Sequence, residues 1–301
     1  MNHVDILRYT FPISGVDTYL FIPPLVAFAI SFFTSMAGIS GAFLILPFQM
    51  SVLGFTAPAV SATNFLYNIV GTPGGIFRYA REKRMIWPLV TGIISGTLPG
   101  VMIGYYLRVK YLPEPKMFKL FVGAVLLFVG FRLVKGLGRH QKSFNKTAPG
   151  TWRIHHISYH PYKIIFSFIG KEFFISIPVI FFFSFIIGIV GGIYGIGGGA
   201  IIAPFCVSVL NIPVFAVAGA VLTANFVTSL AGISFYSVIP IYNGNAAAPD
   251  WMLGILFGIG GMVGMYLGAR CQKHTPEKMI KLILALVIFT IAGRYITQYF
   301  Y

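Results

Sequence analysis

Two long stretches without a charged residue dominate the pattern of polar and apolar positions along the chain. One lies between Asp17 and Arg78 and spans 60 residues, and the other lies between Glu172 and Asp250 and spans 77. A helix needs about 20 apolar residues to cross the hydrocarbon core of a bilayer. Each stretch therefore has room for three crossings, and this pattern alone predicts a membrane protein.

Glycine and proline residues interrupt both stretches and divide them into separate helices. The interruptions fall at residues 38–41, 54–58, 195–199 and 211–213. The segment between the two interruptions of each stretch has only about a dozen residues, too few to cross about 30 Å of hydrocarbon at 1.5 Å per residue. We predict that each short segment is a half-helix or a re-entrant segment.

Four further apolar segments predict ordinary spanning helices, at Trp87–Val109, Lys116–Lys135, Trp251–Cys271 and Lys278–Thr297. Together with the two uncharged stretches they indicate an all-α polytopic protein of the cell membrane, with about 8–10 transmembrane segments. A basic, polar segment separates two apolar halves. We therefore divide the chain into a first membrane repeat at residues 18–136, a basic cytoplasmic linker at 137–172 and a second membrane repeat at 173–301.

The two halves are copies of one another. When the chain is shifted by 157 residues, Gly38–Ile76 aligns without a gap to Gly195–Ile233, with 15 identities in 39 positions. A shift of 164 residues then pairs Trp87 with Trp251 in the next helix. Duplicated membrane halves are typical of transporters, in which the substrate site forms between the repeats.

Two equivalent loops differ in charge. The loop Arg78–Arg84 carries four Lys or Arg residues, whereas its counterpart Ile239–Asp250 carries none. The positive-inside rule places the first in the cytoplasm and the second outside. This favours inverted repeats of five spans each, with both termini outside, over parallel repeats of four spans each. The basic loop Arg108–Lys119 falls outside in the inverted arrangement, which counts against it.

Composition and charge agree with a membrane protein and favour lipid over nucleic acid as its partner. Hydrophobic residues make up 57% of the chain and charged residues 10%, against about 25% charged in soluble domains. The formal net charge of +15 lies at the ends of apolar runs, which indicates contact with anionic lipid headgroups and not nucleic acid. Cys206 and Cys271 are expected to be free thiols.

The glycine-rich interruptions are the first candidate for functional chemistry. Adjacent glycines weaken a helix by about 1 kcal/mol each relative to alanine. A helix that restarts after such a break presents free N–H groups and the positive end of its dipole, which suits an anion. The candidate residues are Ser40, Gly41, Gly197, Gly198 and Gly199. The alternative is that these glycines serve only close helix packing.

Polar residues in the helix after each break are the second candidate. Ser61, Asn64, Asn68 and Thr72 share one helical face, and Asn68 and Asn225 are repeat equivalents. An amide in hydrocarbon is unfavourable unless it is paired. We predict that Asn68 and Asn225 donate hydrogen bonds to the anion. The alternative is that they form hydrogen bonds between helices.

Four features together resemble the sulfite exporter TauE/SafE family of membrane permeases over about residues 20–300. They are the Gly-x-Gly-Gly-Gly break followed by Pro204, the Ala/Ser/Thr-rich next helix, the Gly-x-x-x-Gly helix after Trp251 and the two-fold repeat. The resemblance implies transport of sulfite, sulfonates or other sulfur-containing anions. The first break departs from the motif, with Ser40 in place of a glycine, although Ser40 could donate a hydroxyl hydrogen bond.

A permease for a small sulfur-containing anion is the function that the sequence favours, and it has several alternatives. No Asp, Glu, Lys or His lies well inside a predicted span, so a substrate that carries its own proton or export driven by the membrane potential is expected. A channel or carrier for another small anion or a neutral solute is the alternative. An enzyme would need a nucleophile with a base, or a metal cluster. No enzyme, cofactor or metal site is predicted, and the oligomeric state stays open.

Two further patterns have simpler interpretations. Gly-x-x-x-Gly faces recur in the fourth helix of each repeat, at Gly96, Gly100 and Gly104 and at Gly260, Gly264 and Gly268. Close helix packing is the expected role of these faces. In the linker, His156 and His160 would suit a metal if that segment were helical, but Pro161 and the lack of a neighbouring carboxylate or Cys argue against it.

Overall fold

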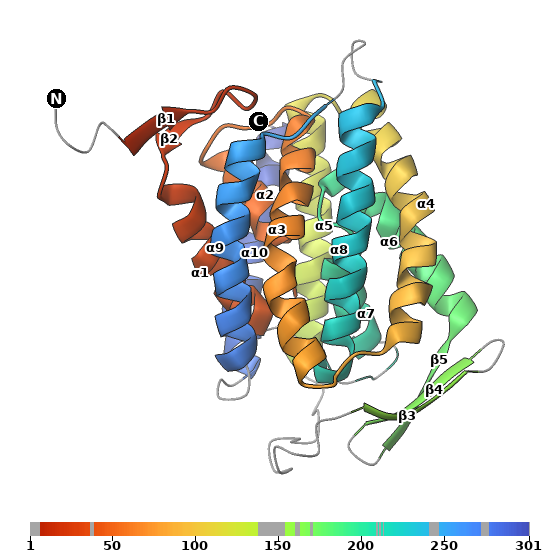
Figure 1. Cartoon of the computed structure of the whole chain (residues 1–301). Helices are drawn as coiled ribbons and strands as arrows, with labels where there is room; N and C mark the ends of the chain where they lie inside the picture. The colour runs from red at the N-terminus through yellow and green to blue at the C-terminus, as the bar shows by residue number, and fades with distance from the viewer. Residues whose placement is uncertain are drawn as a thin grey trace.

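The structure is a computed structural model of the chain, and it shows an upright bundle of helices with a small sheet at its lower end (Figure 1). It describes residues 7–36, 39–137, 154–159, 163–168, 171–208, 210, 212, 214–240, 247–271 and 277–300. Three residues discussed above, Gly38, His160 and Pro161, lie outside the described residues.

Ten helices in the described residues divide evenly between the two halves, in agreement with an all-α polytopic fold. The first half contains α1 (Ile22–Met36), α2 (Ala42–Ser51), α3 (Ala59–Arg81), α4 (Trp87–Tyr111) and α5 (Pro115–Leu137). The second half contains α6 (Ile177–Tyr194), α7 (Gly199–Ser208), α8 (Val214–Val238), α9 (Trp251–Cys271) and α10 (Glu277–Phe300). The predicted boundaries of α4, α5, α9 and α10 agree with these within three residues.

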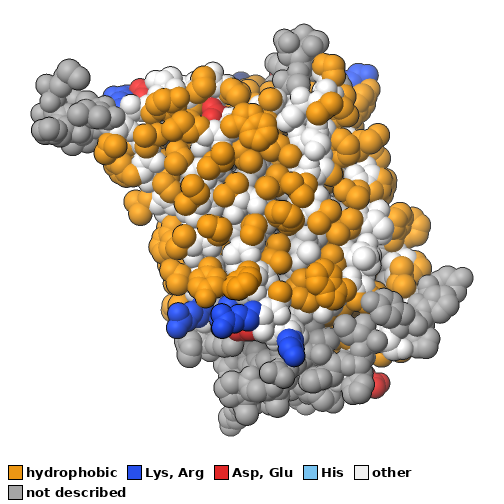
Figure 2. All heavy atoms as spheres, viewed as in Figure 1, with side chains coloured by type: hydrophobic (Ala, Val, Ile, Leu, Met, Phe, Trp, Pro, Cys, Tyr) orange, Lys and Arg blue, Asp and Glu red, His pale blue; other side chains and the backbone are white. Residues whose placement is uncertain are grey.

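The face of the bundle seen in Figure 2 carries a broad apolar belt. Six helices in the described part of the chain are long and apolar enough to cross a membrane. Side chains that point outward from them are large and apolar, such as Phe131 and Phe182, which are 64% and 66% exposed. In Figure 2, Lys and Arg side chains gather below this belt, where headgroups would lie. The chain is thus a multi-pass membrane protein.

The two half-helices predicted from the interruptions are present. Both α2 and α7 have 10 residues. At 1.5 Å per residue such a helix is about 15 Å long, half of the hydrocarbon thickness. Each lies between a glycine-rich break and a second loop, as the positions of glycine and proline predict.

The halves interlock because each contributes its first helix to the other. Helix α4 packs on α6 and helix α9 packs on α1. A Cβ added at Gly96, Gly100 or Gly104 would overlap the carbonyl oxygens of Phe181, Phe185 or Ile189 in α6. A Cβ at Gly260, Gly264 or Gly268 would overlap the carbonyl oxygens of Pro24, Phe28 or Phe32 in α1. These three α1 residues are the repeat equivalents of the three contacted in α6. The packing role predicted for these glycine faces is confirmed.

Helices α3 and α8 cross at the centre, and their contacts are reciprocal. A Cβ at Gly75 would lie 2.9 Å from Leu222, and a Cβ at Gly232 would lie 2.7 Å from the ring of Phe65. Gly75 is the repeat equivalent of Gly232, and Phe65 is that of Leu222. A relation of this kind, in which i contacts j and j contacts i, is the property of a two-fold axis.

The two central helices run in opposite directions. The start of α8 lies beside the loop after α3, because a Cβ at Gly219 would be 3.0 Å from the carbonyl oxygen of Arg84. At the other end, the hydroxyl of Tyr105, near the end of α4, donates to the carbonyl of Ile239, just beyond α8. The loops that follow α3 and α8 therefore lie at opposite ends of the bundle (Figure 1).

Five short strands complete the described structure. A hairpin of β1 (Arg8–Thr10) and β2 (Asp17–Tyr19) lies at the upper end, where the Ser14 hydroxyl donates to the carboxylate of Asp250 at 2.8 Å. Strands β3 (Ile154–Tyr159), β4 (Lys163–Phe168) and β5 (Lys171–Ser176) form an antiparallel sheet at the lower end. His156 lies in β3, so the helical spacing considered for a metal site does not apply to it.

Candidate anion site

The second break is a sharp left-handed turn between α6 and α7. Gly195 has φ +82° and Gly197 has φ +62°, values that side-chain-bearing residues rarely adopt. The Gly195 N–H donates to the carbonyl of Gly191 at 2.8 Å and closes the last turn of α6. The run of glycines thus produces the break that the sequence predicts, and α7 begins at Gly199.

Neighbouring helices satisfy the carbonyl groups that the break exposes. The Ser61 hydroxyl of α3 donates to the carbonyl of Ile193 at 3.0 Å. The Tyr236 hydroxyl of α8 donates to the carbonyl of Gly192 at 2.9 Å. Backbone polar groups inside a membrane must be satisfied within the protein, so α3 and α8 hold the end of α6 in place.

At the first break, Ser40 joins the chain to α3. Its hydroxyl donates to Oδ1 of Asn68 at 2.8 Å and accepts from the Ala42 N–H at 3.3 Å. Ser40 thus accepts from the first N–H of α2 and fixes the amide of Asn68. The Asn68 amide nitrogen is buried and has no hydrogen-bond partner among the described residues. It is therefore a donor that an anion could use.

The second break repeats this arrangement with one difference. Gly197 is the equivalent of Ser40, and a Cβ there would overlap Oδ1 of Asn225, the equivalent of Asn68. It would also lie 3.1 Å from the hydroxyl of Thr228. Because glycine has no hydroxyl, Gly197 cannot accept from a backbone N–H at the start of α7 as Ser40 does from Ala42. The second break is thus the one better suited to expose N–H groups to a ligand.

Both asparagines lie at the middle of their helices. Asn68 is the tenth of 23 residues in α3, and Asn225 is the twelfth of 25 in α8. Both are fully buried, at 0% exposure. Tyr194 is the last residue of α6, and its hydroxyl donates to the carbonyl of Phe43 in α2 at 2.8 Å. This hydrogen bond joins the elements beside the two breaks. Depth, burial and this link fit a site between the repeats.

The other predicted residues lie against neighbouring helices. Gly41 lies where a Cβ would be 2.5 Å from the hydroxyl of Tyr67, and Gly198 where a Cβ would be 2.6 Å from Thr97. The Asn64 amide donates to the carbonyl of Ala42 at 3.0 Å, so Asn64 and Ser61 form hydrogen bonds between elements. For these two residues the alternative interpretation of the polar face is the correct one.

Two buried polar residues of α2 and α3 were missed from the sequence. The Tyr67 hydroxyl lies 2.7 Å from that of Ser31 and faces Gly41. Its position, three residues after Asn64, could have placed it on the polar face. Gln49 in α2 is fully buried, and neither of its amide atoms has a hydrogen-bond partner among the described residues. It is the single glutamine of the first uncharged stretch, which was the available signal.

Interlocked repeats, paired half-helices and buried amides at the middle of two long apolar helices indicate the class of protein: a membrane transporter. The model of the sulfite exporter TauE/SafE family matches residues 24–295, and the chain belongs to that family.

Two curated proteins of Bacillus subtilis (strain 168) are similar over most of their length. The probable membrane transporter protein YunE is 24% identical over 272 residues, covering 88% of this chain and 92% of the relative. The probable membrane transporter protein YjnA is 20% identical over 257 residues, covering 84% of this chain and 90% of the relative. No solved structure matches the chain.

Proposed function

We propose that the protein is a secondary transporter that exports a small sulfur-containing anion, sulfite or an organosulfonate. The observation that carries this proposal is the pairing of each glycine break with an asparagine at mid-helix, Ser40 with Asn68 and Gly197 with Asn225. Membership of the sulfite exporter family supports the choice of substrate. The proposed activity is movement of the anion without a chemical reaction.

The proposed site binds the anion through neutral donors. Ser40, Gly41, Asn68, Gly197, Gly198, Gly199 and Asn225 are the residues we assign to it. Backbone N–H groups and amides stabilise a sulfur oxyanion without a buried cation that would hold it too tightly. A negative cell interior favours outward movement of an anion by about 2.3 kcal/mol per charge for each 100 mV. A channel or carrier for another small anion or a neutral solute is the second candidate.

Asn68→Leu is expected to weaken transport of sulfite. The substitution removes the buried Asn68 amide, and loss of one donor to a buried anion costs about 1–3 kcal/mol. The apparent affinity should fall by roughly 5- to 150-fold, at 1.4 kcal/mol per tenfold. Counterflow of radiolabelled sulfite in proteoliposomes measures it, with Asn225→Leu as the matched variant at the equivalent position. Unchanged affinity in both well-expressed variants would place the site elsewhere.

We further propose that the repeats have inverted topology. The opposite directions of α3 and α8 support it. So does the charge asymmetry between Arg78–Arg84, at the lower end, and the loop Ile239–Asp250, which carries no Lys or Arg and whose described residues Ile239 and Pro240 follow α8 at the upper end. In this arrangement the lower end faces the cytoplasm.

Cysteines placed at Lys83 and Pro240 are expected to label from opposite sides of the membrane. Lys83 follows α3 and the exposed Pro240 follows α8. A Cys271→Ser background removes the half-exposed native thiol, whereas Cys206 is buried. A membrane-impermeant maleimide applied to whole cells should label Pro240→Cys alone, and Lys83→Cys should label only after the cells are opened. Labelling of both from the same side would exclude inverted repeats.

A further inference from the structure

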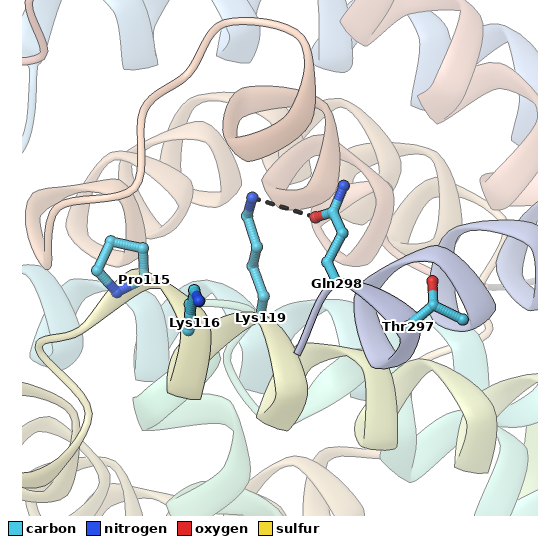
Figure 3. Close-up of a pocket in the computed structure, with 5 residues that line it drawn as sticks. All are labelled: Pro115, Lys116, Lys119, Thr297 and Gln298. Carbon is cyan, nitrogen blue, oxygen red and sulfur yellow. Dashed lines mark hydrogen bonds between the residues drawn. The ribbon is translucent and has the colours of Figure 1, made fainter. Parts of the chain in front are cut away.

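A cavity of about 560 Å³ lies between the start of α5 and the end of α10 (Figure 3). Five residues line it: Pro115, Lys116 and Lys119 from α5, and Thr297 and Gln298 from α10. These two helices pack on one another, and this end of the pair lies at the upper end of the bundle, opposite the Arg78–Arg84 loop. None of the five residues that line the cavity belongs to the two glycine breaks.

The chemistry of the lining suits a polyoxygen anion. Its five residues carry two positive charges, on Lys116 and Lys119, and no negative charge. The Lys119 ammonium donates to Oε1 of Gln298 at 3.3 Å, and Figure 3 shows the amide nitrogen of Gln298 turned away from this bond. Two lysines and a glutamine, from two helices, thus line one space. A phosphate group, with several acceptor oxygens, satisfies them together.

The surroundings of the cavity favour a ligand that is part lipid. Met117, beside Lys116, is 43% exposed, and Phe300, just beyond Gln298, is 71% exposed. Farther along the same pair of helices, Phe128 and Leu286 are also exposed. Phe128 and Leu286 lie nearer the middle of the two helices than the cavity does, where acyl chains would surround them. A ligand with an anionic head and apolar tails therefore fits both the cavity and the apolar surface of the same two helices.

We propose that this cavity binds the phosphate group of an anionic phospholipid. The site is separate from the proposed transport site and does not depend on what the protein transports. A free phosphate or sulfur oxyanion shares the same head chemistry, so the test must separate the lipid from the soluble ion.

The duplication supplies a matched control. Lys278 and Lys281 are the repeat equivalents of Lys116 and Lys119, with the same spacing at the start of α10. They lie at the opposite end of the α5–α10 pair, because the end of α10 meets the start of α5. Lys278→Gln with Lys281→Gln removes the same charge from the protein as Lys116→Gln with Lys119→Gln, but leaves the cavity intact.

Native mass spectrometry of the purified full chain, titrated with phosphatidylglycerol, tests the proposal. The tightest lipid should bind about tenfold more weakly to the Lys116→Gln/Lys119→Gln variant than to wild type, a difference of about 1.4 kcal/mol. The Lys278→Gln/Lys281→Gln control should retain wild-type affinity, and phosphatidylcholine should bind all three proteins equally. Monodisperse elution and an unchanged melting temperature would establish that each variant is folded.

Three results would overturn the proposal. Equal phosphatidylglycerol affinity in wild type and the cavity variant would exclude a headgroup site there. An equal loss in the control would show a general effect of net charge. Binding of inorganic phosphate to lipid-free wild type that the cavity variant loses, with phosphatidylglycerol binding unaltered, would assign the cavity to a soluble anion.

Discussion

Gly100→Ala and Gly264→Ala are each expected to destabilise the protein, and by similar amounts. A Cβ at Gly100 would overlap the carbonyl oxygen of Phe185, and a Cβ at Gly264 would overlap that of Phe28. Helix backbone lies on the other side of each contact, so neither site can relax by moving a side chain. Overpacking of this kind costs about 1–3 kcal/mol. Thermal unfolding in detergent, followed by fluorescence-detected size exclusion, measures the loss.

Gly293→Ala is the matched control for these substitutions. Gly293 lies inside α10, and a Cβ there would meet nothing within 4 Å. Because alanine favours a helix over glycine by about 1 kcal/mol, this variant should be at least as stable as wild type. If all three alanine variants had the same melting temperature, close approach of the helices would not explain the glycine faces.

Gly197→Ala is expected to abolish most transport activity. The added methyl group would overlap Oδ1 of Asn225, and the φ of +62° disfavours a side chain by about 1–2 kcal/mol. Displacement of Asn225 would remove a donor from the proposed site. A further 1–3 kcal/mol lost from anion binding corresponds to roughly 5- to 150-fold in affinity. Sulfite counterflow in proteoliposomes measures this.

Gly54→Ala separates strain from displacement of Asn225. Gly54 has φ +71°, and a Cβ there would meet nothing within 4 Å. The variant therefore suffers the same backbone strain without touching the proposed site, and it should transport sulfite close to the wild-type rate. Equal loss of transport in Gly54→Ala and Gly197→Ala, at matched protein levels, would attribute the effect to stability alone.

The helices and their breaks could be predicted because each depends on local sequence. Charge-free length indicates how many helices each stretch can hold, and glycine clusters mark where α6 ends and α7 begins. The repeat could be found by alignment of the chain with itself. For the same reason the equivalence of Asn68 and Asn225 was visible without a structure.

The partners of these elements could not be predicted, because they depend on tertiary packing. No local sequence pattern indicates that α1 packs on α9. None indicates that the Ser40 hydroxyl donates to Asn68, a residue of the protein, and not to a ligand. The sheet at the lower end was also missed. Residues 163–168 alternate between buried and partly exposed side chains, as a strand does. They lie in a segment that was interpreted as a linker because of its basic charge.

The exchange of first helices between the halves has a consequence for how the chain is made. The glycine face of α9 is the surface against which the backbone of α1 packs. During synthesis α1 enters the membrane long before α9 has left the ribosome. Until then the first half has an unmatched helix, and translation of the second half must supply the surface that completes it. A fragment ending before α6 would lack partners for both α1 and α4. Co-expression of the two halves as separate chains should therefore yield protein where either half alone is degraded.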